Sequence, residues 1–242
     1  MEHENRAKIK EIFSSIQGEG LCIGCKQIFI RFCACNLNCN YCDTDFMPTN
    51  INDKNAFFDF TPTELLKYLK DNYDINLHHS ISLTGGEPLI WVEFLKEFLP
   101  LLKSKYKPKI YLETNGTISD NLKELQENID IISADIKLPS CSGIKNSFKM
   151  HGKFFDAVPK KFYETNNIYA KVVFDSNIKD DEITRTTTLA KKYDLPLILQ
   201  PRMIGNNFSV NTDFMVKTFD KFITKYPNTR FIPQVHKYID VE

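Results

Sequence analysis

The chain has 242 residues, and its 31 Lys plus Arg balance its 31 Asp plus Glu, so the formal net charge at pH 7 is zero. The length suits a single domain over residues 1–242, and 42% hydrophobic residues suffice for a large core. The balanced charge argues against a nucleic-acid partner, and we expect no membrane segment and no secretory leader. Seven cysteines, an odd number, disfavour a disulfide framework, so we expect a cytoplasmic protein.

The first segment with a readable pattern is Glu11 to Gly20, in which we expect Ile12, Phe13 and Ile16 to be buried. It ends in the polar turn Gln17-Gly18-Glu19-Gly20, whose two glycines allow a backbone to approach a ligand closely. An ordinary surface turn has the same composition, so the turn alone does not indicate a site.

Residues Lys26 to Phe32 alternate as a strand would, with Ile28, Ile30 and Phe32 on one face. Arg31 falls on the opposite face, immediately before the most unusual segment of the chain. A lone arginine on a strand is usually solvated or paired, so Arg31 is of interest only because of that neighbouring segment.

The segment Phe32 to Thr44 carries Cys35, Cys39 and Cys42 in the spacing C-x3-C-x2-C. Every second residue from 36 to 40 is asparagine, which favours turns over a helix. A [4Fe–4S] cube normally takes four thiolates, so three thiolates would leave one iron open to a small molecule. We therefore predict an iron–sulfur cluster at this loop and expect the chemistry at its open iron.

A zinc site is the alternative interpretation of the cysteines. Cys22 and Cys25 precede Cys39 and Cys42 in the arrangement C-x2-C-x13-C-x2-C, which is close to a zinc-ribbon spacing. Spacing alone leaves both metals open, and a non-catalytic zinc-binding module is the alternative from a different class of protein. The sequence assigns no role to the two other thiols, Cys33 and Cys141.

The tripeptide Asp43-Thr44-Asp45 comes after the third cysteine and places hydroxyl and carboxylate oxygens close together. Mg²⁺ prefers hard oxygen ligands and keeps several of its waters, so this tripeptide is a candidate magnesium site. A solvated turn is the competing interpretation of an isolated D-T-D sequence.

Beyond residue 60, helices and strands alternate regularly. The capping box Thr61-Pro62-Thr63-Glu64 opens a helix that runs to about Tyr73. Further helices are expected over 90–105, 121–127, 182–193 and 213–225, an irregular or helical stretch over 147–167, and strands over 79–83, 110–113, 129–136, 168–174, 197–199 and 231–235. This alternation implies a parallel sheet, and about six such units predict an incomplete (β/α)6-type TIM-like barrel.

Polar residues gather at the expected carboxyl ends of these strands. They are Thr84, Glu113, Asp135, Lys137, Asp175, Gln200 and His236. In parallel α/β barrels that rim carries the active site. Because the cysteine loop also comes after a strand, we expect all these side chains to converge on it.

Two motifs resemble the radical S-adenosylmethionine superfamily: the three cysteines with Tyr41 before the last of them, and Gly85-Gly86-Glu87-Pro88. In that superfamily the open iron binds the amino and carboxylate groups of S-adenosylmethionine, and cleavage of the sulfonium releases a 5′-deoxyadenosyl radical. The resemblance implies that the cofactor-binding residues are Gly86, Glu113, Ser133, Asp135, Lys137 and Gln200.

Longer stretches resemble one family within that superfamily, the 7-carboxy-7-deazaguanine synthases. They are Ser15 to Gly20, Phe29 to Arg31, Cys35 to Leu37, Tyr41 to Thr44, Asp135 to Ser140 and Gln234 to Lys237. Members of that family are Mg²⁺-dependent carbon–nitrogen lyases of queuosine and deazapurine biosynthesis. They contract the ring of 6-carboxy-5,6,7,8-tetrahydropterin to a pyrrole and expel ammonia.

The resemblance also implies roles for individual residues toward such a pterin. Arg31 suits bidentate recognition of its carboxylate, and Glu19 would accept hydrogen bonds from ring nitrogens. These two are the expected catalytic residues, and Thr44 resembles the family's magnesium ligand. The other expected substrate contacts are Ile16, Gln17, Gly18, Thr84 and His236.

The nearest rival within the superfamily is a glycyl-radical-enzyme activase, which shares the cysteines but acts on a protein backbone. The resemblance also implies an electron donor such as a flavodoxin or a ferredoxin. An exposed strand edge in an open barrel makes a homodimer a reasonable expectation. The other histidines have the character of surface or packing residues: His3, His78, His79 and His151.

Overall fold

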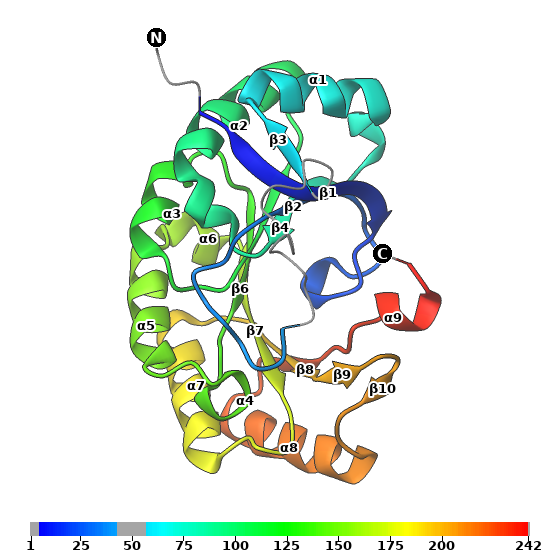
Figure 1. The fold of residues 1–242 in the computed structure, drawn as a ribbon. Helices are drawn as coiled ribbons and strands as arrows, with labels where there is room; N and C mark the ends of the chain where they lie inside the picture. Colours follow the sequence, from blue (N-terminus) through cyan, green and yellow to red (C-terminus); the bar gives the residue numbers. More distant parts are fainter. Residues whose placement is uncertain (1–4, 43–56, 242) are drawn as a thin grey trace.

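The computed structural model describes residues 5–42 and 57–241 (Figure 1). Its centre is a nine-stranded sheet with the strand order β11-β8-β7-β6-β5-β4-β2-β1-β3. The strands are β1 (Ala7–Ile16), β2 (Lys26–Phe32), β3 (Phe58–Phe60), β4 (Ser80–Gly85), β5 (Ile110–Thr114), β6 (Ile131–Asp135), β7 (Ile168–Phe174), β8 (Leu197–Pro201) and β11 (Thr229–Phe231). A separate hairpin pairs β9 (Met203–Ile204) with β10 (Asn207–Phe208). The predicted magnesium ligand Thr44 lies outside the described residues.

The pairing of the strands agrees with the predicted parallel sheet. Strands β2, β4, β5, β6, β7, β8 and β11 pair with their neighbours in parallel. Strand β1 runs antiparallel to β2, and β3 runs antiparallel to β1. Within the described part of the chain, the sheet ends at β3 on one side and β11 on the other, so it does not close into a barrel.

The helices cover the outer face of the curved sheet, whereas the β1–β2 connection and the C-terminal segment lie on its inner side (Figure 1). The helices are α1 (Pro62–Asn72), α2 (Val92–Tyr106), α3 (Ser119–Leu125), α4 (Pro139–Ser142), α5 (Ser147–Ala157), α6 (Lys160–Glu164), α7 (Asp180–Tyr193), α8 (Thr212–Lys225) and α9 (His236–Ile239). The short 3₁₀ turns are η1 (Gly20–Cys22), η2 (Ile75–Leu77) and η3 (Pro88–Trp91). None of the described helices has the length and apolar character that crossing a membrane requires.

The two faces of β2 have different environments. Ile28, Ile30 and Phe32 are fully buried in the core that the sheet forms with the outer helices. Arg31 points to the other face and lines a cavity. Side chains alternate along a strand with a period of two residues, so the placement of Arg31 opposite the apolar face is confirmed.

The inner face of the sheet is filled at the amino-terminal ends of its strands by a small plug. Tyr111, Tyr169 and Ile198 are its buried members, and Leu21 and Cys22 of the β1–β2 connection pack against them. The hydroxyls of Tyr111 and Tyr169 are hydrogen-bonded to each other. Each of these three buried residues is the second residue of its strand. The plug therefore leaves the carboxyl end of the inner face for a ligand.

Local signals explain where elements begin and end. Thr61 caps α1 as predicted: its Oγ1 accepts a hydrogen bond from Glu64 N at 3.2 Å, and Glu64 Oε2 accepts one from Thr61 N at 2.8 Å. The prediction of a strand over 231–235 is wrong, because β11 already ends at Phe231. Pro233 has no N–H for a ladder bond, which stops the pairing. His236 consequently begins α9 instead of coming directly after a strand.

Candidate active site

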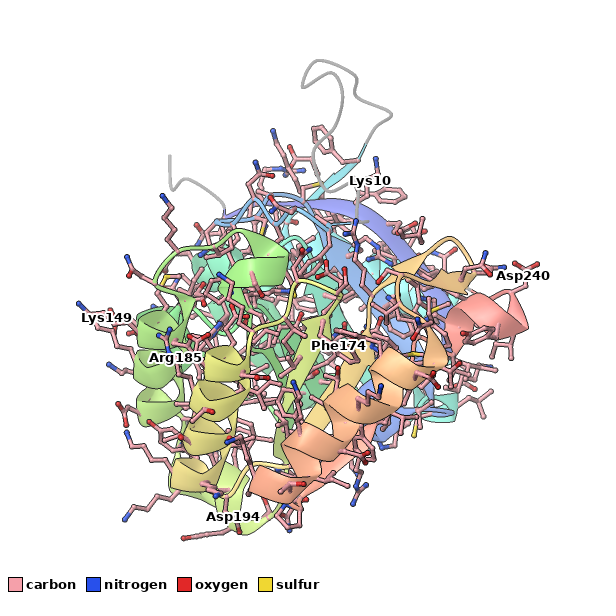
Figure 2. All side chains as sticks on the ribbon, turned by 90° about the horizontal axis from the view of Figure 1, so that it is seen from below. Lys10, Lys149, Phe174, Arg185, Asp194 and Asp240 are labelled. Atoms are coloured by element: carbon pink, nitrogen blue, oxygen red, sulfur yellow. The ribbon has the colours of Figure 1, made fainter. Side chains whose placement is uncertain are left out.

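A cavity of about 450 Å³ lies at the carboxyl ends of the parallel strands, within the usual range for small-molecule sites. It brings together most of the residues that the sequence singled out: Ile16, Gln17, Gly18, Glu19, Arg31, Cys35, Cys39, Cys42, Thr84, Gly86, Glu113, Asp135, Lys137, Gln200 and His236. Figure 2 shows Lys10, another lining residue, at the opposite end of the molecule from Asp194, the C-terminal cap of α7.

Two of the predicted polar residues do not line the cavity: Asp175, expected at the rim, and Ser133, expected to contact the cofactor. Asp175 is buried and pairs instead with Arg202, whose Nη1 lies 3.6 Å from Asp175 Oδ2. Ser133 is also buried and is hydrogen-bonded to Tyr169 in the plug. Ser133, expected to contact the cofactor, therefore lies beneath the cavity floor.

The cysteine loop after β2 is pressed against the turn after β4. Gly86 N donates to Phe32 O at 3.0 Å, and Glu87 N donates to Ala34 O at 2.9 Å. A Cβ on Gly86 would overlap the carbonyl oxygen of Ala34, so only glycine fits here. The sequence predicts that Gly86 lets a cofactor approach the backbone closely. In the structure, Gly86 also lets the turn after β4 approach the cysteine loop closely.

Glu87 ties the same turn to the end of β5. Its fully buried carboxylate accepts hydrogen bonds from Leu89 N at 3.1 Å, Thr114 Oγ1 at 2.9 Å and Asn115 N at 2.7 Å. Burial raises the pKa of Glu87 to about 7, against the opposing effect of these donors. Asn115 continues the network, because its Nδ2 lies 3.7 Å from Cys35 Sγ.

The cysteine thiols suit a cluster better than a single ion. Burial raises the pKa of Cys35 and of Cys39, and Leu37 N points at Cys35 Sγ from 3.4 Å. Among residues 5–42 and 57–241, no three His, Cys, Asp or Glu side chains are close enough to hold one metal ion. Zinc keeps each thiolate at about 2.3 Å, whereas an iron–sulfur cube binds each thiolate through a different iron and so tolerates wider spacing.

The zinc alternative is wrong for this fold. Cys22 and Cys25 precede β2, while Cys39 and Cys42 come after it. The seven residues of that strand, at about 3.3 Å each, put roughly 20 Å between the two pairs. None of the seven cysteines forms a disulfide, and Cys22 packs against the plug.

Two buried polar atoms in the cavity wall lack a hydrogen-bond partner among the described residues. They are Oη of Tyr41, in the cysteine loop, and Oε1 of Gln200, in β8. Buried polar atoms are almost always hydrogen-bonded, so both indicate a polar ligand in the cavity. The ammonium of Lys137 lies 5.5 Å from the centre of the Tyr41 ring. These residues fit a cluster with S-adenosylmethionine beside it.

Charged side chains form an alternating row across the cavity floor. The Glu19 carboxylate pairs with Lys171 Nζ, which also lies 3.3 Å from Asp135 Oδ1. Asp135 Oδ2 accepts in turn from Lys137 Nζ at 2.7 Å. Burial alone would raise the pKa of Glu19, but its neighbours, Lys171 above all, lower it to about 2. Glu19 is therefore a carboxylate at every pH near neutrality.

The side chain of Gln17 links three neighbouring residues through hydrogen bonds. Its Nε2 donates to Gln27 Oε1 at 3.0 Å and to Glu113 Oε1 at 2.8 Å. Its Oε1 accepts from Glu19 N at 3.0 Å. We expected the Gln17 side chain to contact a substrate; in the structure both of its amide N–H groups are engaged, and the side chain orients Glu19.

Glu113 is predicted to contact the cofactor and Thr84 the substrate, but in the structure these two side chains are hydrogen-bonded to each other. The Glu113 carboxylate accepts from Thr84 Oγ1 at 3.0 Å and from Ser82 Oγ at 3.2 Å, in addition to Gln17. Burial raises the pKa of Glu113. The sequence placed these residues on the rim but gave no sign that they support one another.

The other expected contacts come from the β1–β2 connection and the C-terminal segment. Ile16, expected to be buried, is 40% exposed because it is the last residue of β1 and faces the cavity. Val235 N donates to Gly18 O at 2.9 Å, and a Cβ on Gly18 would collide with His236. The two segments therefore form one continuous wall.

Sequence reasoning missed the importance of His151 and Lys171. His151 is fully buried in α5; its Nε2 accepts from Lys137 N at 2.9 Å, and its Nδ1 donates to Gly116 O at 2.9 Å. Burial lowers the pKa of His151 to about 4, so the ring is neutral and bridges the loops after β5 and β6. The importance of Lys171 could have been predicted from the sequence, because it is the one charged residue in the otherwise uncharged strand β7.

Comparisons with known proteins agree with this arrangement. The family model described as the Radical SAM superfamily matches residues 29–158. The 7-carboxy-7-deazaguanine synthase of Geobacter sulfurreducens is 34% identical over 249 residues, covering 96% of this chain and 97% of that protein. The 7-carboxy-7-deazaguanine synthase of Archaeoglobus fulgidus is 34% identical over 241 residues, covering 98% and 99% respectively.

Solved structures support the fold. The crystal structure of QueE from Escherichia coli matches with a TM-score of 0.64 at 20% identity, over 96% of this chain and 95% of that one. A radical SAM methyltransferase from Sphaerobacter thermophilus matches with a TM-score of 0.61 at 11% identity, over 86% of this chain and 66% of that one.

The predicted family is therefore confirmed, and the glycyl-radical-enzyme activase is set aside. The superfamily implies a [4Fe–4S] cluster and S-adenosylmethionine, and the family is one of lyases in deazapurine biosynthesis. The chain belongs to the 7-carboxy-7-deazaguanine synthase family of the radical SAM superfamily.

Proposed function

We propose that this enzyme converts 6-carboxy-5,6,7,8-tetrahydropterin to 7-carboxy-7-deazaguanine with release of ammonia. The observation that carries the proposal is the meeting of the three-cysteine loop, the Arg31 guanidinium and the Glu19 carboxylate in one cavity. A cation and an anion in one small cavity suit a substrate with a carboxylate at one end and N–H donors at the other.

The two charged groups orient the substrate. Arg31 Nε is bonded to Glu11 Oε1 at 2.5 Å, which leaves its terminal nitrogens for a bidentate contact with the substrate carboxylate. The Glu19 carboxylate accepts hydrogen bonds from the amino and ring N–H groups of the pterin. Ile16, Gly18, Thr84 and His236, which line the cavity, would contact the ring.

The cofactors bind on the cysteine side of the cavity. Cys35, Cys39 and Cys42 would hold the cluster, and S-adenosylmethionine would satisfy the orphaned atoms of Tyr41 and Gln200. When bound, these groups would supply the one-electron chemistry for removing a hydrogen atom from the substrate and returning it. The other residues that would position the cofactor are Gly86, Glu113, Asp135 and Lys137, with Ser133 supporting them from below.

A magnesium ion completes the proposed site. Thr44 would hold it with its hydroxyl, and the ion would neutralise charge that develops on the substrate. Activity that depends on added Mg²⁺ after treatment with EDTA supports this role, and Thr44→Ala should raise the Mg²⁺ concentration needed. Full activity of the EDTA-treated enzyme would rule the metal out.

We also propose that the whole chain forms one domain, acts in the cytoplasm as a homodimer, and receives its electron from a flavodoxin or ferredoxin. Size-exclusion chromatography with light scattering measures the oligomer. Turnover driven by each reduced carrier, in the absence of a chemical reductant, identifies the donor.

The decisive experiment is turnover by anaerobically reconstituted enzyme supplied with the carboxytetrahydropterin, S-adenosylmethionine and a reductant. We expect 7-carboxy-7-deazaguanine and ammonia in equal amounts. Arg31→Ala should lower kcat/KM by about 100-fold with iron and sulfide content unchanged, because a charged contact to the substrate is lost. Arg185→Ala is the matched control, since Arg185 lies over Phe148 at 4.1 Å and does not line the cavity. Absence of product from the fully loaded wild-type enzyme would refute the proposal.

A further inference from the structure

Lys171 joins the two sides of the cavity floor. Its Nζ pairs with Glu19, from the β1–β2 connection, and lies 3.3 Å from Asp135 at the end of β6. The side chain itself comes from β7 and is only 11% exposed. A single ammonium therefore connects the proposed substrate residue Glu19 with the proposed cofactor residue Asp135.

The Glu19 carboxylate is fixed at both of its oxygens. Oε2 binds Lys171 Nζ, and Oε1 accepts from Gln234 Nε2 at 2.7 Å. The backbone is fixed as well, because Glu19 N donates to Gln17 Oε1. The carboxylate has one orientation, and Lys171 supplies the only formal positive charge bonded to it among the described residues.

The charged groups around Glu19 explain why that cation matters. The acidic groups of Glu113 and Asp135 interact electrostatically with Glu19, while Lys171 and His236 favour its charge. Burial also opposes ionisation of Glu19. Without Lys171, the carboxyl group would be left buried beside two other acids, and its pKa would rise.

We infer that Lys171 is a positioning residue that fixes Glu19 in its charged, acceptor-only form, and that this makes the site select substrates presenting N–H donors to Glu19. This inference rests on the proposed pterin substrate. An ionised carboxylate only accepts hydrogen bonds, so it opposes a 2-oxo analogue that presents an acceptor where the pterin has its 2-amino group. A neutral carboxyl group can donate, so it would tolerate the analogue.

The test compares binding of the carboxytetrahydropterin and its 2-oxo analogue by anaerobic equilibrium dialysis. The holoenzyme, loaded with S-adenosylmethionine, is measured from about pH 6 to about pH 8.5 as wild type, Lys171→Met and Lys171→Arg. Lys103→Met is the matched control, because Lys103 pairs with Asp130 at 2.7 Å but does not line the cavity.

For the wild type we expect tight pterin binding, weak analogue binding and no change in their ratio over this pH range. Lys171→Met should weaken pterin binding by about 100-fold. Its remaining affinity should fall as the pH falls and Glu19 takes up a proton, while the preference for pterin over analogue narrows. Lys171→Arg should restore most of the preference and the flat profile, and Lys103→Met should behave as wild type.

If Lys171→Met keeps the wild-type preference and a flat pH profile, the inference is overturned while the proposed function stands. A wild-type holoenzyme that neither binds nor turns over the pterin would overturn both. If Lys171→Met does not fold, Lys171→Met/Glu19→Gln removes the uncompensated charge and is measured in its place. We expect this double variant to fold without preferring pterin over the analogue; a restored preference would contradict the inference.

Discussion

Glu11 and Arg31 are directly opposite each other in the antiparallel pair β1–β2, and Arg31 Nε donates to Glu11 Oε1 at 2.5 Å. The guanidinium carbon also lies 5.6 Å from the centre of the Phe13 ring, which stacks on Phe29 at 4.9 Å. Strand β1 therefore holds Arg31 through two of its side chains, Glu11 and Phe13. The guanidinium is oriented before a carboxylate arrives, which lowers the entropy lost on binding.

Glu11→Ala should therefore weaken substrate binding with little change in kcat. Freeing the Arg31 side chain costs on the order of 1 kcal/mol when it is ordered again, which corresponds to about a fivefold increase in KM. Steady-state kinetics of the loaded enzyme measure both constants. Glu93→Ala is the control, because Glu93 pairs with Lys96 within α2, away from the cavity. A drop in kcat at unchanged KM would contradict the positioning role of Glu11.

Gly86→Ala should impair both stability and cluster loading. The added methyl group would overlap the Ala34 carbonyl oxygen, so the cysteine loop and the turn after β4 must separate. We expect a loss of about 1–3 kcal/mol in the free energy of unfolding, and less bound iron after reconstitution. Urea denaturation and iron assays measure these two quantities.

The chain offers a matched control for that substitution at Gly152, in the middle of α5, where an added Cβ would meet no atom within 4 Å. Gly152→Ala should raise the free energy of unfolding by up to about 1 kcal/mol, because alanine favours a helix. Equal effects of the two substitutions would show that the contact between Gly86 and Ala34 is unimportant.

The free energy of unfolding should fall as the pH drops from about 6.5 to about 4, in part because of His151. Burial lowers the pKa of His151 to about 4 in the folded protein, whereas an unfolded chain has a value of about 6.5. In this window the unfolded state binds a proton that the folded state does not, so His151 contributes its full stability only above about pH 6.5. The loss is at most about 3 kcal/mol at the acid end.

His151→Gln should remove that part of the pH dependence and keep one acceptor for Lys137 N. Urea denaturation of the metal-free protein at a series of pH values measures the difference between variant and wild type. Protonation of Glu19 on acidification also lowers the free energy of unfolding, but both proteins contain Glu19, so its contribution cancels in the comparison. Parallel pH curves for the two proteins would show that His151 does not titrate as described.

Cysteine substitutions should separate the cluster ligands from the packing thiols. Cys39→Ser should abolish stoichiometric iron and sulfide and the visible absorption of the reconstituted protein, because a serine hydroxyl replaces one thiolate. Cys25→Ser should load the cluster normally, since Cys25 lies at the other end of β2. Loss of iron from Cys25→Ser would mean that the two ends of the strand share a metal after all.

Much of the fold could be predicted because its signals are local. Strand β7 stands out by its β-branched and aromatic residues, and the predicted bounds 168–174 match it. The gathering of Glu113, Asp135 and Gln200 at one cavity results from parallel strands, whose carboxyl ends share an edge. The spacing of the cysteines marked their loop as a metal site but did not by itself decide between a cluster and zinc, and the loop lies beside these residues at the cavity.

What the sequence could not supply were pairings that depend on how the sheet curves. Glu19 meets Lys171 across 152 positions of sequence and Gln234 across 215, and no local pattern encodes such contacts. The same limit applies to Gln17, whose place in a ligand-binding motif gave no indication that its amide is occupied by Gln27 and Glu113. Side chains that support a site can have the same composition as side chains that touch a ligand.

The bond from Gln234 to Glu19 has a consequence for how the protein is made. Glu19 leaves the ribosome 215 residues before Gln234 does, yet the two share a hydrogen bond at 2.7 Å. A chain still in synthesis can form its cysteine loop long before this wall is complete. The residues of the cysteine loop and the residues that complete this wall of the cavity are therefore synthesised at different times.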